Sequence, residues 1–284
     1  MTYIHASPSS QSSVSGWSAS IVLYQPDLNR LAETLTSLTV AVRALRGRYG
    51  ETPFMLVVVD NGNTPDFAFL QERLKAARID IQIISGQGNV GYGCGHDLAL
   101  SCIASQYHII LNPDVELAPD ALVHAHMFFD AYPDAGLLAP CVADEWGTVQ
   151  FLCRRFPTVL DLFVRGFVPR RWHRLFARRL AHYEMRDVIN GLDIVWDPPI
   201  VSGCFMLFRT GVLKLLGGFD SRYFLYFEDY DLSLRAHKVT RVAYVPSVKI
   251  VHHGGGAARK GWLHIKLFVL SAVKFYRRFG WKWA

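Results

Sequence analysis

The sequence predicts an α/β fold with a mostly parallel central sheet flanked by helices, followed by an amphipathic helix at the C-terminus. Apolar runs of strand length alternate with segments of helical periodicity over residues 18–139. Polar residues that can do chemistry follow directly after several of these runs. With 284 residues, 51% of them hydrophobic, the chain is long enough to bury one large core.

The first half of the chain is expected to supply four strands and three helices. The strands are expected at residues 18–24, 54–59, 79–84 and 107–111, and the helices at 29–45, 67–77 and 95–104. The first helix has apolar residues at helical spacing: Leu31, Leu35, Leu38, Val42 and Leu45. Strands that alternate with helices imply right-handed crossovers and a mostly parallel sheet, with the site at the carboxyl ends of the strands.

The second half continues the pattern less regularly. Helices are expected at 119–132, 210–216 and 229–236, and strands at 136–139, 200–209, 242–245 and 248–251. A segment in between mixes aromatic residues with nine arginines: Arg154, Arg155, Arg165, Arg170, Arg171, Arg174, Arg178, Arg179 and Arg186. We therefore expect a mobile arm over 1–16, one domain over 17–256 and a helical tail over 257–284.

Composition restricts the class of protein. Charged residues make up 19% and aromatic residues 13%, which excludes a disordered chain. The net charge of +6 favours an anionic partner, whether nucleotide phosphate, nucleic acid or membrane surface. The five cysteines have no CxxC spacing, as expected of reduced thiols in the cytosol. The Ser-rich start does not look like a signal peptide, and no apolar run reaches the ~20 residues of a spanning helix.

Asp60 and a glycine-rich stretch are the first candidate ligand contacts. Asp60 ends an expected strand, where it can bind a nucleobase or ribose hydroxyl, or can simply form an Asx-turn before Asn61 and Gly62. In residues 86–97, glycines at positions 91, 93 and 95 allow a close approach of backbone to ligand. The stretch does not follow the first strand as a Rossmann GxGxxG does, which argues against a dinucleotide site.

The sequence Asn112-Pro113-Asp114 is a candidate metal motif. The proline fixes an extended turn that holds the Asp114 carboxylate outward at the edge of the sheet. Such a carboxylate suits Mg²⁺ or Mn²⁺ bound to phosphates, although a structural turn aspartate is the alternative. Glu116 is either a supporting residue or simply exposed.

A cluster of acids follows an aromatic run near residue 228. Glu228, Asp229 and Asp231 stand where a helix is expected to begin, so they can be a helix cap. Three acids within four residues would be costly if purely structural. One of them can therefore serve as a general base that deprotonates an acceptor hydroxyl.

The paired histidines His252 and His253 end a late strand and precede three glycines. A single histidine in this place is usually structural. Two of them, followed by Arg259 and Lys260, can supply a metal ligand and phosphate contacts.

Taken together, these motifs resemble glycosyltransferase family 2, whose members are inverting enzymes of GT-A fold, over about residues 17–256. The resemblance rests on the order and spacing of IVLYQPD, VVVDNGN, GNVGYGCGHD, LNPDVEL, PPIVSGCFMLFRTGVLKLLGGFD and FLYFEDYDLSLRAHK. The bacterial rhamnosyltransferases that build O-antigen and other cell-surface polysaccharides look most similar. One departure is Asn112 at the first position of the DxD motif, which leaves one carboxylate for the cation.

The resemblance implies a role for each site residue. Asp229 would be the catalytic base and Glu228 would position the acceptor or the base. Asp114, with one of His252 and His253, would bind Mg²⁺ or Mn²⁺. The expected donor contacts are Asp60, Asn89, Gly91, Gly93, Asn112 and Arg259.

The function implied is sugar transfer with inversion, with L-rhamnose from dTDP-L-rhamnose as the donor sugar and a polyprenyl-diphosphate-linked saccharide as acceptor. A UDP-sugar transferase, a nucleotidyltransferase and a catalytically inactive membrane-peripheral binding protein are the alternatives. Nucleic-acid binding would not explain the acidic cluster. We expect a cytoplasmic protein, peripheral at the inner face of the cytoplasmic membrane through its apolar, cationic tail, unless that helix packs against the domain instead.

Overall fold

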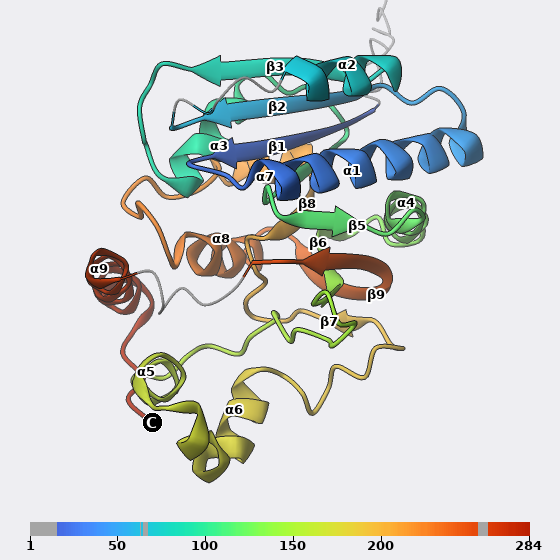
Figure 1. The fold of residues 1–284 in the computed structure, drawn as a ribbon. Coiled ribbons are helices and arrows are strands. Elements are labelled where there is room, and N and C mark those ends of the chain that lie inside the picture. Colours follow the sequence, from blue (N-terminus) through green and yellow to red (C-terminus); the bar gives the residue numbers. More distant parts are fainter. Residues whose placement is uncertain (1–15, 63, 65–67, 255–260) are drawn as a thin grey trace, which may run out of the picture.

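A nine-stranded sheet forms the centre of the described part of the chain (Figure 1). The structure is a computed structural model that describes residues 16–62, 64, 68–254 and 261–284. The strands are β1 (Trp17–Leu23), β2 (Phe54–Asp60), β3 (Asp80–Ser85), β4 (Tyr107–Leu111), β5 (Val115–Leu117), β6 (Ala135–Ala143), β7 (Val195–Trp196), β8 (Phe205–Arg209) and β9 (Arg241–His252). Their order is β3-β2-β1-β4-β8-β6-β9-β5, with β7 beside β9.

Most strands of this sheet run in one direction. The first four pair in parallel, and β6 pairs in parallel with β9. The strand β8 joins these two groups by antiparallel pairing with β4 and β6. The short strands β5 and β7 are antiparallel to β9. The predicted α/β class with a mostly parallel sheet is confirmed.

Helices cover both faces of the sheet. They are α1 (Leu28–Tyr49), α2 (Ala68–Ala76), α3 (Tyr92–Leu100), α4 (Ala121–Ala131), α5 (Val159–Phe167), the 3₁₀ turn η1 (Arg170–Phe176), α6 (Ala177–Tyr183), α7 (Thr210–Leu215), α8 (Glu228–Ala236) and α9 (Trp262–Phe279). Successive residues of β2 point to opposite faces. Leu56 and Val58 pack in the core with α1 and α4, whereas Val57 and Val59 pack with Ala99 of α3.

Three predicted strands differ from the structure. The strand expected at 200–209 begins only at Phe205, because residues 203–204 form a turn and the Gly203 N–H bonds to Asp229 of α8. The two strands expected at 242–245 and 248–251 are one strand, β9. Its pairing with β6 shifts where Pro140 and Cys141 face Val245 and Lys249, next to Pro246, which lacks the N–H that a regular ladder needs.

The C-terminal helix α9 lies at one side of the molecule near α5 and α8 (Figure 1). Phe275 and Tyr276 of α9 are buried against Leu162, Tyr223 and Phe227. Among the described residues, the structure has no helix long and apolar enough to cross a bilayer. The expected arm over 1–16 falls outside the described residues except for Gly16, and so does Arg259.

Candidate active site

The carboxyl ends of β2 and β4 meet at the same edge of the sheet, because both strands run parallel to β1 between them. Asp60 ends β2, and its carboxylate accepts hydrogen bonds from the backbone N–H groups of Gly62 and Thr64 at 3.0 and 2.9 Å. The Thr64 hydroxyl donates to the same carboxylate at 2.8 Å. Asp60 therefore forms the Asx-turn that the sequence left open, and its role in donor binding stays a prediction.

The glycine loop packs against the segment that precedes α8. Asn89 Oδ1 accepts the N–H of Gly91 at 3.0 Å, and the Asn61 side chain donates to the Gly91 carbonyl at 3.0 Å. Gly91 has φ +90°, and a Cβ here would lie 2.4 Å from the Phe224 carbonyl oxygen. Tyr92 N donates to that same oxygen at 3.1 Å. In this structure the lack of a side chain at Gly91 allows the glycine loop to pack directly against the backbone at Phe224.

Gly93 and Gly95 are also in close contact with the protein. A Cβ at Gly93 would lie 2.8 Å from Phe219, and one at Gly95 would lie 2.8 Å from Val22. His96, on the same helix, is 1% exposed, and its Nδ1 lies 2.7 Å from the Ser20 hydroxyl. Burial lowers the pKa of His96 to about 3, so it is a neutral core residue.

Asp114 and His252 form the candidate cation site. The carboxylate of Asp114 lies 3.5 Å from His252 Nε2. A Cβ on Gly254 would lie 2.5 Å from both the Asp114 Oδ2 and the His252 Nε2 atoms, so only glycine leaves this position open. Among the residues that the structure describes, none forms a hydrogen bond with the buried Nδ1 of His252. A carboxylate and an imidazole, with Asn112 two residues before Asp114 in the chain, are donor types that suit Mn²⁺ or Mg²⁺, so the residues present fit the predicted cation.

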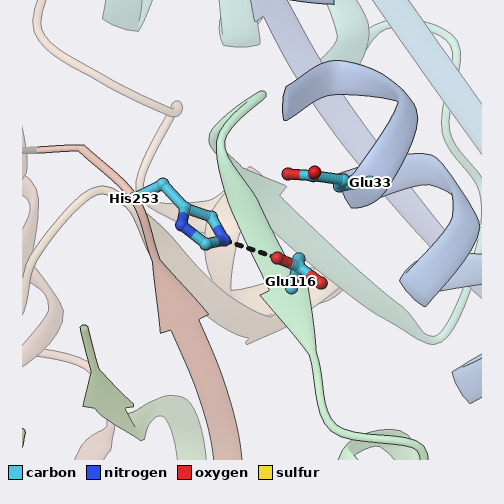
Figure 2. A group of neighbouring side chains, drawn as sticks. All are labelled: Glu33, Glu116 and His253. Carbon is cyan, nitrogen blue, oxygen red and sulfur yellow. Dashed lines mark hydrogen bonds and ion pairs between the residues drawn. The ribbon is translucent and has the colours of Figure 1, made fainter. Parts of the chain in front are cut away.

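His253 points to a different group of side chains. Its Nε2 lies 2.5 Å from Glu116 Oε1, and Glu33 of α1 completes a group whose ligand atoms lie within 4.8 Å of one another (Figure 2). Glu33 is also paired with Arg30 at 2.9 Å. The structure thus places His252 beside Asp114 and His253 beside Glu116. The sequence had left the role of Glu116 open.

The acidic pair Glu228 and Asp229 begins α8. Asp229 is only partly exposed, and its carboxylate accepts the N–H groups of Gly203 and Tyr230, each at 2.9 Å. Burial raises the pKa of Asp229 above its usual value, against the opposing effect of these hydrogen bonds. Burial, with the charge of Asp229, raises the pKa of Glu228 well above its usual range. A held carboxylate of raised basicity is what a general base requires.

Two residues that the sequence did not single out connect the glycine loop to the acidic pair. The Tyr92 hydroxyl donates to the Gly203 carbonyl at 2.5 Å, and Gly203 N donates to Asp229. A Cβ at Gly203 would lie 3.2 Å from that of Asp229. The position of Tyr92 between Gly91 and Gly93 could have indicated that it lies in the site. No local pattern in the sequence indicates a role for Gly203.

A family model described as glycosyl transferase family 2 matches residues 18–217, more than half of the chain. The chain belongs to glycosyl transferase family 2. It is 27% identical to the N-acetylglucosaminyl-diphospho-decaprenol L-rhamnosyltransferase of Mycobacterium tuberculosis over 82% of this chain and 74% of that protein. The rhamnosyltransferase WbbL of Escherichia coli is 24% identical over 70% of this chain and 73% of that protein.

Solved structures with the same fold include S. aureus TarS 1–349, with TM-score 0.57 and 15% identity over 92% of this chain and 65% of that one. GalNAc-T7 with UDP, GalNAc and Mn²⁺ has TM-score 0.62 and 13% identity over 94% of this chain and 48% of that one. The mannosyltransferase PcManGT from Pyrobaculum calidifontis, with GDP-Man and Mn²⁺, has TM-score 0.57 and 17% identity over 93% of this chain and 64% of that one. These likenesses show that the fold is that of GT-A glycosyltransferases.

Proposed function

We propose that this glycosyltransferase moves L-rhamnose from dTDP-L-rhamnose, with inversion, onto a polyprenyl-diphosphate-linked saccharide during polysaccharide or O-antigen assembly. The observation that carries the proposal is the Asp229 carboxylate, held by two backbone N–H groups and made more basic by burial. The choice of sugar and acceptor follows the mycobacterial relative, which is an N-acetylglucosaminyl-diphospho-decaprenol L-rhamnosyltransferase.

In the proposed reaction, Asp229 accepts the proton of the acceptor hydroxyl while that oxygen attacks the anomeric carbon of the donor. Glu228 orients the acceptor or the base. Attack from the face opposite the nucleotide diphosphate inverts the configuration at that carbon. Asp60, Asn89, Gly91, Gly93, Asn112 and Arg259 remain the proposed donor contacts, of which Arg259 lies outside the described residues.

Asp114 and His252 are the proposed cation ligands, with Asn112 as a third. A bound Mn²⁺ or Mg²⁺ supplies positive charge that stabilises the departing diphosphate. His253 was predicted as a ligand too, but its imidazole is engaged by Glu116, so we propose His252 for this role.

The proposed partner surface is the cytoplasmic face of the membrane that carries the acceptor. The outward side of α9 exposes Trp262, Leu263 and Leu270 by 78%, 64% and 48%, with the exposed Lys266 among them. Apolar and cationic side chains in this combination suit an interface with anionic lipid. Three arginines of segment 154–186 are instead paired with acids within the protein: Arg155, Arg179 and Arg186.

The test is to incubate the purified chain with dTDP-L-rhamnose and a polyprenyl-diphospho-GlcNAc, with UDP-sugars in parallel. We expect transfer from dTDP-L-rhamnose and from none of the UDP-sugars. NMR of the product should show that the configuration at the anomeric carbon is inverted relative to the donor. Transfer from a UDP-sugar would replace the donor assignment, and no transfer or hydrolysis from any donor would favour the inactive binding protein.

A further inference from the structure

One stripe of side chains on α9 lies along the segment that leads into α8. Its residues recur at alternating spacings of four and three, which share one face of a helix. They are His264, Phe268, Ser271, Phe275 and Arg278. The exposed residues Leu263 and Leu270 do not belong to this stripe and lie on the outward side, so the helix has two distinct faces.

The first half of the stripe holds the backbone just before the acidic pair. The Tyr226 hydroxyl lies 2.8 Å from His264 Nδ1, and the Ser271 hydroxyl donates to the Leu225 carbonyl at 2.8 Å. Tyr226 and Phe227 have φ of +70° and +66°. Two consecutive non-glycine residues in the left-handed region persist only where the surroundings hold them. Contacts with α9 supply part of that hold.

The second half reaches α8 itself. Arg278 Nη1 lies 2.7 Å from Asp231 Oδ2, and Asp231 is fully buried two residues after Asp229. The other Asp231 oxygen lies 2.5 Å from Arg235 Nε. A buried carboxylate needs such partners, so removing one cation leaves a poorly compensated charge directly behind the acidic pair. Phe275, also fully buried, packs on Phe227 with ring centroids 5.2 Å apart.

The same segment is held from its other side by the glycine loop. Phe224 accepts the Tyr92 N–H and abuts Gly91, as described above. The backbone between Arg222 and Glu228 therefore lies between α3 and α9, and its conformation depends on both.

We propose that α9 is a positioning element of the active site, which holds Glu228 and Asp229 in place through the Arg278–Asp231 ion pair and Phe275. This inference rests on the proposed role of Asp229 as the base. It assigns the C-terminal helix a part in turnover that is independent of lipid. A helix that only anchors the protein would affect turnover only on a membrane.

The test compares Arg278→Met with Arg277→Met, its exposed neighbour, using a short-chain soluble acceptor and no lipid. For Arg278→Met, misplacement of the base should lower kcat by about tenfold to a hundredfold. The dissociation constant of the donor nucleotide should stay within about twofold, since only an interaction used in the reaction is lost. Arg277→Met should match the unmodified enzyme, and Arg278→Lys should recover part of kcat.

Hydrogen–deuterium exchange over residues 222–231 provides a readout that does not depend on transfer. We expect faster exchange there in Arg278→Met and not in Arg277→Met, with both proteins folded by circular dichroism. Unchanged exchange together with unchanged kcat would overturn the inference. The inference would also be overturned if Arg278→Met lost kcat and donor affinity to the same extent and a smaller folded fraction accounted for both losses. If the unmodified enzyme transfers no sugar, the proposed function fails, while the exchange experiment still decides whether α9 holds the segment.

Discussion

Replacing Asp229 by Asn removes the proposed base while keeping its size and shape. The carboxylate now accepts the N–H groups of both Gly203 and Tyr230. An amide has one oxygen, so it can accept only one of them in the same pose and must turn its NH₂ toward the other. The substitution therefore costs at least one buried hydrogen bond in addition to the base.

The sizes of the two effects separate folding from catalysis. An unmade buried hydrogen bond costs about 1–3 kcal/mol. Removal of a buried charge offsets part of this, because burial already disfavours the charged form, as the raised pKa of Asp229 indicates. Loss of general-base catalysis lowers turnover by about 10²–10⁴, which is about 2.7–5.5 kcal/mol of barrier. We expect Asp229→Asn to stay folded, bind donor normally and lose turnover to this extent.

A control for the change of charge is Asp144→Asn. Asp144 also accepts two backbone N–H groups, those of Trp146 and Thr148 at 3.0 and 2.8 Å, in a turn between β6 and α5. Both bond to its Oδ1, so an asparagine there can keep both hydrogen bonds and loses only the charge. Rates of sugar transfer, donor affinity by calorimetry and thermal unfolding should be measured for both variants. Turnover of Asp229→Asn within a few-fold of the unmodified enzyme would refute its assignment as the base, as would an equal loss in Asp144→Asn.

Four further outcomes are expected. Chelator should abolish transfer, and added Mn²⁺ should restore it in the unmodified enzyme but not in Asp114→Asn. If Mn²⁺ restores transfer in Asp114→Asn and fails to restore it in Glu116→Gln, the cation binds beside His253 instead. Gly91→Ala should destabilise the protein by about 1–3 kcal/mol more than Gly86→Ala in urea unfolding. Both glycines have φ +90°, but among the described residues only a Cβ at Gly91 would meet a close neighbour, and equal losses of stability would contradict this. Replacing both Leu263 and Leu270 by Asp should lower flotation with anionic liposomes by at least about tenfold. Leu215→Asp, which alters a leucine of α7 that is even more exposed, should not. Glu228→Gln should gain stability over the unmodified protein between pH 5 and 8.

The sign of the Glu228 prediction follows from its raised pKa. The folded state retains the proton to higher pH than the unfolded state, whose carboxyl titrates near 4.5. The titration of Glu228 therefore costs the unmodified protein no stability below pH 4.5. It lowers the free energy of unfolding as pH rises from there toward the folded-state pKa. Gln cannot ionise, so its advantage should be absent at pH 4 and present at pH 7 in denaturant titrations. A constant difference across this range would contradict the argument.

The sequence was informative where chemistry follows a strand end. Asp60 and Asp114 could be located because a buried apolar run before each of them predicts a strand, and parallel strands end at one edge. The sheet order could not be read from local patterns, since β8 inserts between β4 and β6 from far along the chain. Tertiary pairing of that kind leaves little trace in periodicity.

Residues that act through a backbone N–H could not be predicted from the sequence. Gly203 matters because its N–H meets Asp229, and any residue with an N–H in that place would look the same in sequence. The choice between His252 and His253 depended on which of two adjacent side chains turns toward Asp114, and this requires coordinates. The tail was predicted either to dock on lipid or to pack on the domain, and the structure packs one face and leaves the other exposed.

The two faces of α9 make these alternatives compatible. Its inward stripe is fixed by directional contacts, two of them to the backbone and the buried acid that flank Asp229. Its outward side has no such requirement and exposes Trp262 and Leu263. A helix that met lipid through its inward stripe would have to abandon the Arg278–Asp231 pair and leave Asp231 buried with one cation. Membrane contact through the outward side leaves that pair intact, so on our proposal the enzyme can dock beside its acceptor without disturbing the base.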